Sequence, residues 1–521
     1  MTVPSQLHAA WKHRIVADQA SVDDTTAQLL AARHECQLAE DALALAAAKV
    51  EHLKAEVRLL EQRQSAATEQ LARSRAASLR IAASNLPDDV LRCIFTCCAA
   101  LPDAQWTQLG HGSFNRERTT LPFSLAAVCT RWRRVALDYG GLWTYISLPS
   151  IFASEGAARR RSCHHGRIER LLSRSQLFPL DVLLNLGVVD FNSPNESKWI
   201  RSIFASISYH SDRWRRVEID FPHACGRDIA GAFKGPLPML KQLLLLGPYS
   251  EAWVNMDDEN SYFLPHAPML EALDLCRTGF DISPVHGGFP SLHSITVTND
   301  MSAESLRRLL ELSRTTLQVL DMNVQFNEAS PLSLTLPNLR TLVLHLELFF
   351  VTAQRTVNLN APRLSALTLR SADIMFDDAL SVLLEHVSAT VTSLTLYEDV
   401  CMDFIDTFAR LRNLSHIVFG TRDYGCQVDD QFFVALSKQV PTVWPRLQSI
   451  VLHDGKITPP HGDGIIQLVA VRNASPNNAS LLSGTETDVS ERPCRIREVN
   501  LPDDTPRWMI AEINRLLVTT S

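Results

Sequence analysis

Clusters of cysteine and histidine are the first places to look for chemistry in this sequence. Cys93, Cys97 and Cys98 lie within one short segment, and Cys163 precedes two histidines. A structural zinc site needs about four Cys or His ligands in paired groups. Neither cluster has a second pair nearby, so we expect no metal site and interpret the three cysteines at 93–98 as buried helix residues.

The sequence lacks the common catalytic and nucleotide-binding motifs. It contains no G-x-x-x-x-G-K-[ST], no G-x-G-x-x-G ahead of a helix, no H-E-x-x-H and no G-x-S-x-G. The acidic runs at 257–259 and 377–378 lack the central glycine of a calcium loop. We therefore predict a non-catalytic protein without a cofactor. An enzyme would need a constellation of histidine, acid and nucleophile that no motif indicates.

The charges argue against a nucleic-acid-binding protein. Arginines gather at 131–134, 159–161 and 213–216, yet the chain has 50 Lys and Arg against 57 Asp and Glu, a net charge of −7. A slightly acidic chain does not attract a polyanion, so we interpret these runs as solvated faces. No apolar run approaches the 18 or so residues of a membrane span. The 11 cysteines and the absence of a signal-peptide layout predict an intracellular protein, cytoplasmic or nuclear.

The elements that position these residues fall into three parts within 521 residues. The first part, 1–84, has a seven-residue pattern without proline or glycine from 21 to 84. Its first positions are mostly Leu or Val, and its fourth positions are mostly Ala or Leu. This pattern predicts a coiled-coil helix. The alternative is one long amphipathic helix that lies on the rest of the protein.

Charges beside this stripe disfavour a parallel self-pair. A parallel pair would set Glu35 against Glu40, Lys49 against Lys54, and Glu56 against Glu61, and all three pairs carry like charges. Three arrangements stay open at this point. They are an antiparallel pair, a different partner, and packing back on the chain.

The second part, 85–148, reads as a small helical unit. Leu86-Pro87-Asp88-Asp89 is a helix start, because proline and acids suit the first turn. A loop within 97–123 follows, then a second helix carries apolar residues on one stripe, and the pair Gly140-Gly141 ends it. We expect a short strand after that stop.

The third part, 165–521, repeats a unit of the form L-x-x-L-x-L. From Trp214 to Leu414 the first positions are separated by eight intervals that average 25 residues, and six units have a proline two residues earlier. Helical stretches such as 302–313, 377–387, 402–411 and 428–439 lie between them. Strand, turn and helix at this period predict a leucine-rich-repeat-like α/β solenoid, with a flexible insertion at 473–491. The prolines stop any helix ahead of each strand.

The predicted sheet has one face that the leucines do not fill. Polar side chains alternate with the buried leucines along each strand, so they line the concave side. We select as candidate substrate contacts Asp274, Asp321, Asn323, His345, Arg370, Tyr397 and His453. An ordinary polar sheet face is the alternative.

Residues 85–148 resemble an F-box. The matching stretches are LPDDVLRCIF, LAAVCTRWRRVAL and GLW, in the order that this family has them. With a helix before them and repeats after them, the chain resembles the large F-box families of fungi. The segment 97–123 is longer than in a compact F-box.

The resemblance implies a substrate-recognition subunit of a cullin-type (SCF) ubiquitin ligase. The F-box would bind a Skp-family adaptor, and through it a cullin and a ring-finger subunit, and the repeats would hold a protein substrate. The adaptor-facing or adaptor-supporting residues that it implies are Leu86, Pro87, Leu91, Ile94, Phe95, Val128 and Trp132. Some of them could serve only the core of the F-box. The alternative function is a protein-interaction scaffold outside any ligase.

Overall fold

The structure is a computed structural model of the chain. It describes most of the chain, in the ranges 4–99, 116–148, 157–186, 194–221, 226–247, 263–278, 288–298, 303–323, 333–345, 358–370, 378–397, 399–400, 404–420, 426–439, 442–453, 456–458, 463–474 and 493–518. Most of the predicted loop at 97–123 and of the predicted insertion at 473–491 lies outside the described residues, as do the acidic segments 257–259 and 377.

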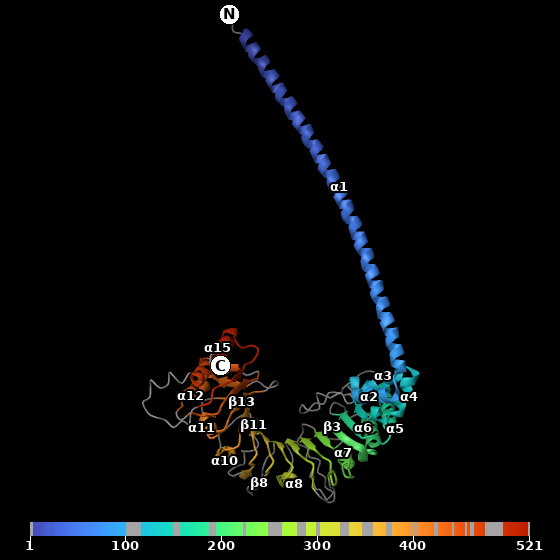
Figure 1. The fold of residues 1–521 in the computed structure, drawn as a ribbon, viewed down its shortest axis with the longest axis vertical. Helices are drawn as coiled ribbons and strands as arrows, with labels where there is room; N and C mark the ends of the chain where they lie inside the picture. Colours follow the sequence, from blue (N-terminus) through green and yellow to red (C-terminus); the bar gives the residue numbers. More distant parts are fainter. Residues whose placement is uncertain are drawn as a thin grey trace. The chain divides into compact units, whose positions relative to one another are not determined.

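The chain divides into two compact units, Met1–Asp88 and Asp89–Ser521. The first unit is essentially one helix, α1 (Pro4–Asn85), which runs without a break through the whole heptad pattern (Figure 1). The expected N-terminal helix is therefore confirmed. Within the described ranges, no helix combines the length and the apolar composition that crossing a bilayer requires.

The second unit begins with three short helices, α2 (Asp88–Ala99), α3 (Arg116–Ala127) and α4 (Thr130–Asp138). We expected one helix after a loop at 97–123. Both expectations were wrong, because residues 116–123 already belong to α3 and the helix is interrupted between α3 and α4. Cys129 takes an extended conformation between them, and its sulfur accepts the N–H of Trp132 at 3.4 Å. This is an N-cap, so the chain must start a new helix at this point. A short 3₁₀ turn, η1 (Gly140–Trp143), ends the segment.

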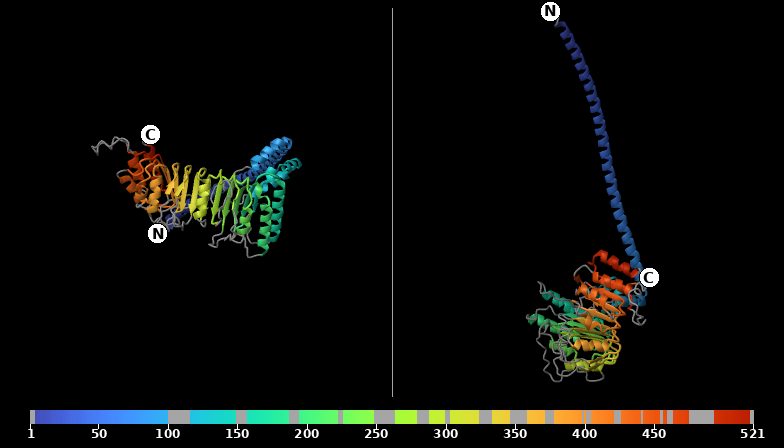
Figure 2. Two further views of the ribbon diagram at one scale, coloured as in Figure 1. Left: turned by 90° about the horizontal axis from the view of Figure 1, so that it is seen from below. Right: turned by 90° about the vertical axis from the view of Figure 1, so that its left-hand side faces the viewer.

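The rest of the unit is built on one large parallel sheet, so the expected mixed α/β class is confirmed. Thirteen strands of the described residues pair in the order β1-β2-β3-β4-β5-β6-β7-β9-β11-β12-β13-β15-β17, which is the order of the chain. The left panel of Figure 2 shows them side by side. Their bounds are Tyr145–Leu148, Leu180–Asn185, Trp214–Asp220, Gln242–Leu246, Ala272–Cys276, Ser294–Thr298, Val319–Asn323, Thr341–His345, Ala366–Arg370, Ser393–Leu396, His416–Phe419, Ser449–Leu452 and Glu498–Asn500.

Leucine spacing explains the two faces of this sheet. In β5 the side chains of Leu273 and Leu275 are almost fully buried, while Asp274 between them is partly exposed. Successive side chains of a strand point to opposite faces, so the leucines of every repeat fill one side. The strand register places the buried apolar residues of neighbouring repeats side by side, for example Leu273 of β5 beside Ile295 of β6.

The prolines of the repeat mark a turn before the strand. Each is the second residue of a four-residue turn, closed by hydrogen bonds such as Leu270 N–H to the Ala267 carbonyl at 3.2 Å and Leu364 N–H to the Ala361 carbonyl at 3.1 Å. The fixed φ of proline suits this position. We expected each proline to end a helix. In the structure it instead forms the turn that sets the direction of the next strand. The prolines are Pro238, Pro268, Pro290, Pro337, Pro362 and Pro445.

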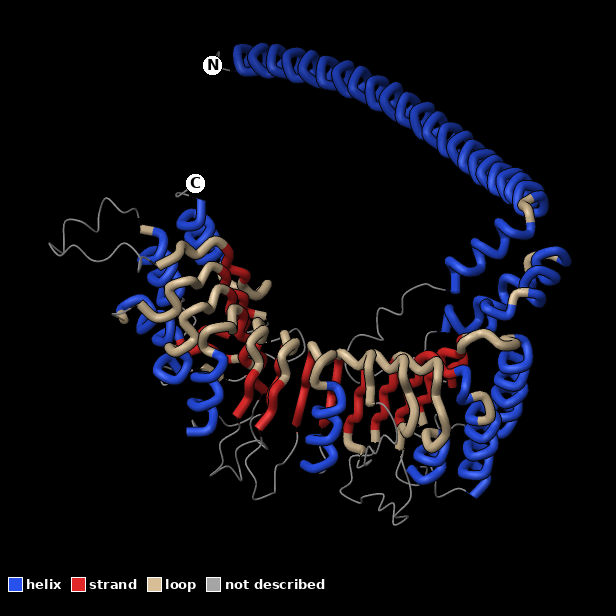
Figure 3. The backbone as a smooth tube through the Cα atoms, turned by 60° about the horizontal axis from the view of Figure 1, so that its bottom comes forward, coloured by secondary structure: helices blue, strands red, loops and turns tan. Residues whose placement is uncertain are grey.

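Helices connect many of the strands and cover the leucine face. In Figure 1, α8 (Ala303–Ser313) and α10 (Asp378–Val387) lie on the outer side of the sheet, and their leucines are buried. Figure 3 shows helices gathered at both ends of the strand series. The remaining helices among the described residues are α5 (Ala157–Arg174), α6 (Pro194–Ser208), η2 (Ser211–Arg213), α7 (Gly226–Ala232), α11 (Phe404–Phe408), α12 (Asp430–Lys438), α13 (Asp463–Asn473) and α15 (Arg507–Val518).

Two small parallel sheets lie outside the main one. They pair β8 (Ser333–Thr335) with β10 (Asn358–Asn360), and β14 (Gln427–Asp429) with β16 (Lys456–Thr458). In these repeats a short strand therefore stands where a helix was expected, or just ahead of it. The predicted helix 428–439 accordingly begins only at Asp430.

Candidate functional site

The first candidate site is the helical unit α2–α4. Leu91 and Phe95 of α2 are completely buried, and the ring of Phe95 meets the ring of Trp132 edge-on at 5.4 Å. These residues come from both halves of the predicted motif, so the two halves share one small core. Leu91 and Phe95 can support a partner surface but do not reach solvent themselves.

Other residues of the expected adaptor set face outward. Val128 is 55 % exposed, Pro87 is exposed, and Ile94, Leu86 and Trp132 are partly exposed. Val128 stands directly before the Cys129 cap, at the corner between α3 and α4. An exposed valine at a fixed corner is available to a partner, whereas the buried pair in α2 is not.

Buried contacts join this helical unit to the sheet. Trp143, which follows α4, is fully buried, and its indole N–H donates to the carbonyl of Ala136 at 2.6 Å. Thr119 of α3 and Ser147 of β1 share a buried hydrogen bond of 2.6 Å. The strand that carries Ser147 pairs with β2, so the helices continue into the first edge of the sheet.

A buried ion cluster at the same junction escaped the sequence analysis. Asp181 of β2 is fully buried, and its carboxylate accepts from Arg118 of α3 at 2.8 Å and from Arg215 of β3 at 2.8 and 2.9 Å. The three residues come from three separate elements, so no spacing indicates them. Arg213 is also buried, so the run 213–216 is not simply the solvated face that we expected.

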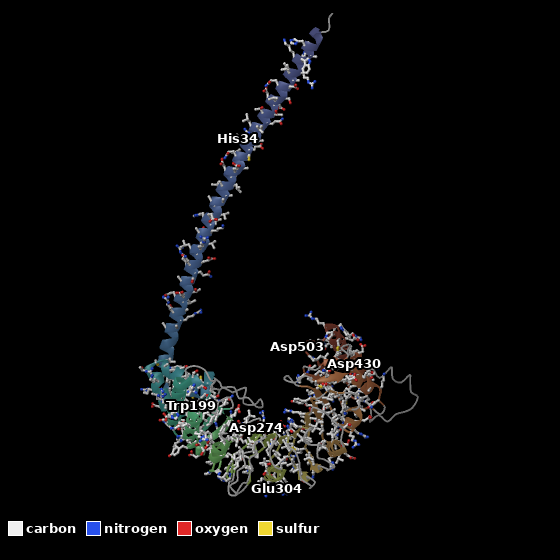
Figure 4. The ribbon with its side chains drawn as sticks, turned by 180° about the vertical axis from the view of Figure 1, so that it is seen from behind. His34, Trp199, Asp274, Glu304, Asp430 and Asp503 are labelled. Carbon is white, nitrogen blue, oxygen red and sulfur yellow. The ribbon has the colours of Figure 1, made fainter. Side chains whose placement is uncertain are left out.

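The second candidate site lies on the inner face, which we define as the sheet face opposite to α8 and α10. Strand pairing sets Asp274, Thr296 and Asp321 in one row across β5, β6 and β7. Figure 4 shows Asp274 on the inner side of the curve and Glu304 of α8 on the outer side. Four further candidate residues lie two positions further along, in the next row of the same face; they are Asn323 of β7, His345 of β9, Arg370 of β11, and Tyr397 just after β12.

Asp321 is the centre of this group. Its side chain is only 7 % exposed, His345 Nε2 lies 3.4 Å from one of its carboxylate oxygens, and Arg370 Nη1 lies 3.8 Å from the other. The guanidinium of Arg370 also stacks over the ring of Tyr397, with 4.8 Å to the centroid. Side chains from four neighbouring repeats therefore meet in one charged group.

Asp274 and Cys276 form a second pair beside it. The Cys276 thiol donates to the Asp274 carboxylate at 3.0 Å. Burial raises the pKa of Asp274 to about 6, and nearby Asp321 adds to this shift, although the thiol opposes it. Burial raises the pKa of Cys276 to about 12, so its thiol is not a ready nucleophile at neutral pH.

We call these residues together the inner polar cluster: Asp274, Cys276, Asp321, Asn323, His345, Arg370 and Tyr397. Four of its buried atoms make no hydrogen bond with another described residue, namely Asp321 Oδ1, Asn323 Oδ1, His345 Nε2 and Arg370 Nε. Buried polar atoms are almost always paired, so this group is suited to polar groups from a ligand. His453 follows β15, three strands beyond β11 in the sheet order, so the candidate contacts do not form one group.

The other chemical candidates are weaker. Cys93 and Cys97 are exposed, so the expectation that they are buried was wrong. No group of three or more metal-ligating side chains occurs among the described residues. His165 pairs with Glu169 at 3.1 Å on its own helix.

Comparison with known proteins adds no family to this geometry. The chain matches no protein-family model and no curated protein.

Proposed function

We propose that this chain is the substrate-recognition subunit of a cullin-type ubiquitin ligase. Residues 85–148 act as an F-box that binds a Skp-family adaptor and, through it, a cullin and a ring-finger subunit. The sheet from β1 to β17 acts as a leucine-rich-repeat-like solenoid that holds a protein substrate. The chain itself does no chemistry, because it acts by bringing a substrate lysine close to the transferring enzyme.

One observation carries the adaptor half of the proposal. The two-part motif builds a single small core from Leu91, Phe95 and Trp132, while Val128 is left outside it at 55 % exposure. The core of the motif closes without Val128, so this side chain is available for contact with a partner. An internal core with an apolar side chain left at its surface is what a binding module needs.

The inner polar cluster supports the substrate half. It joins the guanidinium of Arg370 to the buried carboxylate of Asp321, and several of its polar atoms make no hydrogen bond with another described residue. Such a surface suits a protein segment with charged or hydrogen-bonding side chains. It does not suit a ligand that binds mainly through apolar side chains.

Adaptor binding by a matched pair of variants tests the proposal. Val128→Asp places a charge at the exposed corner, and we expect at least a tenfold loss in capture of a purified Skp-family adaptor by the full chain, because desolvating a carboxylate in an apolar contact is costly. Val471→Asp is the control. Val471 is 52 % exposed on α13, so the substitution has the same chemistry far along the chain.

Three results would decide against a ligase subunit. They are no adaptor capture by the unaltered chain, equal capture by both variants, and adaptor capture without ubiquitination of any captured protein. The last result would favour the scaffold function instead.

A further inference from the structure

Helix α1 carries an apolar stripe that no other element of its own compact unit covers. Every side chain described from 8 to 78 is exposed, including those at the first heptad positions, such as Val22, Leu43 and Val57 at 55 %, 72 % and 52 %. Helices in proteins gain most of their stability by packing an apolar face, so the exposed stripe of this 82-residue helix calls for a partner.

We propose that this stripe pairs with the α1 stripe of a second copy of the chain, in antiparallel orientation and in one register. In that register Leu43 faces Leu53 of the second copy, and Cys36 faces Leu60. Side-chain volume and charge along α1 favour this pairing, which does not depend on the proposed ligase function.

Side-chain volume favours the antiparallel orientation. The fourth heptad positions 32, 39, 46 and 67 are all alanine, while most first positions are Leu or Val. A parallel pair would stack alanine on alanine in these layers and leave voids between larger layers. An antiparallel pair sets each first position against a fourth position, so Val50 meets Ala46 and Val57 meets Ala39.

Charge fixes the same orientation. Reversing one helix exchanges the sides of its stripe, so each flanking row then faces its own equivalent. In the proposed register Arg33 faces Glu61 and Glu40 faces Lys54 on one side, while Glu35 faces Arg63 on the other. Each of these opposite-charge pairs occurs twice in the dimer.

One further charged contact in this register is unfavourable, and it occurs only once in the dimer. Lys49 meets Lys49 of the second copy at the two-fold axis. The parallel arrangement has three kinds of like-charge pair and no opposite-charge pair in the same rows, so charge separates the two orientations clearly.

Charge also selects the register. A shift of one heptad in one direction sets Arg33 against Lys54 and Glu35 against Glu56. A shift in the other direction sets Glu40 against Glu61, with a single compensating kind of pair between Lys49 and Glu56. The proposed register alone among these three gains three kinds of opposite-charge pair.

A charge reversal in the full chain distinguishes the orientations by the sign of its effect. Glu35→Lys breaks the contact with Arg63 in the antiparallel pair, and we expect about tenfold weaker dimerisation by sedimentation equilibrium. The double variant Glu35→Lys with Arg63→Glu restores the affinity. In a parallel pair, Glu35→Lys would instead relieve the repulsion from Glu40 and strengthen the dimer.

Disulfide trapping tests the register with the natural Cys36 as one half. Leu60→Cys places a second thiol opposite Cys36, and we expect mild oxidation to give a covalent dimer through these two positions, identified by peptide mapping. Leu53→Cys is the control, because it makes the same substitution at another fourth position one heptad away. A bond from Cys36 to Cys36 in the unaltered chain, equal trapping by both variants, or a monomeric full chain at micromolar concentration would overturn the proposal.

Discussion

Asp274 is a residue of the inner face whose carboxyl group is difficult to ionise. Burial opposes its ionisation, and the neighbouring carboxylate of Asp321 opposes it further, while the thiol of Cys276 stabilises the charged form. The net result is a carboxyl group whose pKa is about 6. At neutral pH the charge is therefore mostly present and poorly stabilised, which suits a group that a cationic partner would pair with.

This shift predicts a pH dependence of stability. The folded chain holds a proton on Asp274 that the unfolded chain releases at about pH 3.8, so this residue lowers the free energy of unfolding as the pH rises from about 4 to 6. Asp274→Asn removes the cost of ionising a buried carboxyl group, and its amide oxygen can still accept the hydrogen bond from Cys276. We expect it to raise the free energy of unfolding at pH 7.5 by up to about 3 kcal/mol, with little gain at pH 4.

Urea unfolding at both pH values measures this effect. Asp503→Asn serves as the control, because Asp503 is exposed near the C-terminus. A gain that is equal at pH 4 and pH 7.5 would show that the carboxyl group of Asp274 is not the cause.

At the scale of elements, a hydrogen bond at the N-terminus of α13 joins it to α12. The N–H of Gly464, in the first turn of α13, donates to both carboxylate oxygens of Asp430 at 2.9 Å. Asp430 is buried at the start of α12. A carboxylate at the positive end of a helix stabilises it, and here the carboxylate comes from the neighbouring helix.

This close approach predicts opposite effects for two glycine substitutions. A Cβ on Gly464 would collide with the backbone carbonyl of Asp430, so Gly464→Ala should lower the free energy of unfolding by about 1–3 kcal/mol. Gly231 in α7 has nothing within 4 Å of such a Cβ, so Gly231→Ala should be neutral or raise it by up to about 1 kcal/mol. Thermal unfolding of both variants checks the pair, and equal effects would contradict the packing at Gly464.

The elements also show how far sequence reasoning reaches. The leucine spacing predicted the strands of the large sheet from β3 onward, because alternate burial follows directly from a two-residue period. The break between α3 and α4 was not predicted, since a cysteine cap at position 129 leaves the apolar stripe intact. The small sheets β8–β10 and β14–β16 were also missed, because three-residue strands are too short for a periodic pattern.

At the scale of the whole molecule, sequence reasoning failed where distant segments meet. The candidate residues Asp321, His345 and Arg370 do come together, because His345 and Arg370 hold the same place in successive repeats and Asp321 lies two residues earlier in the repeat before them. Asp181 was missed, because its two arginines reach it from a helix before β2 and a strand after it. Repeats make long-range contacts predictable from local spacing, whereas junctions between unlike elements have no such rule.

The Asp181 cluster yields a prediction about cooperativity. Arg118 of α3 is nearly buried and Arg215 is about 40 % exposed, and both depend on one carboxylate. Asp181→Asn keeps the shape and removes the charge, which leaves the arginines uncompensated. We expect the free energy of unfolding to fall by about 3 kcal/mol, at the lower end for breaking a buried pair, because Arg215 retains some solvent.

Because α3, β2 and β3 belong to one compact unit, this loss should affect the whole of Asp89–Ser521 together. Hydrogen exchange on the full chain should show faster exchange in α2–α4 and in the sheet alike, with α1 unchanged. Asp228→Asn is the control, since its ion pair with Arg201 is exposed on both sides and is worth less than about 1 kcal/mol. Faster exchange confined to α2–α4 would mean that the helical unit opens on its own, and an Asp181→Asn effect no larger than that of the control would mean that the cluster does not hold the junction together.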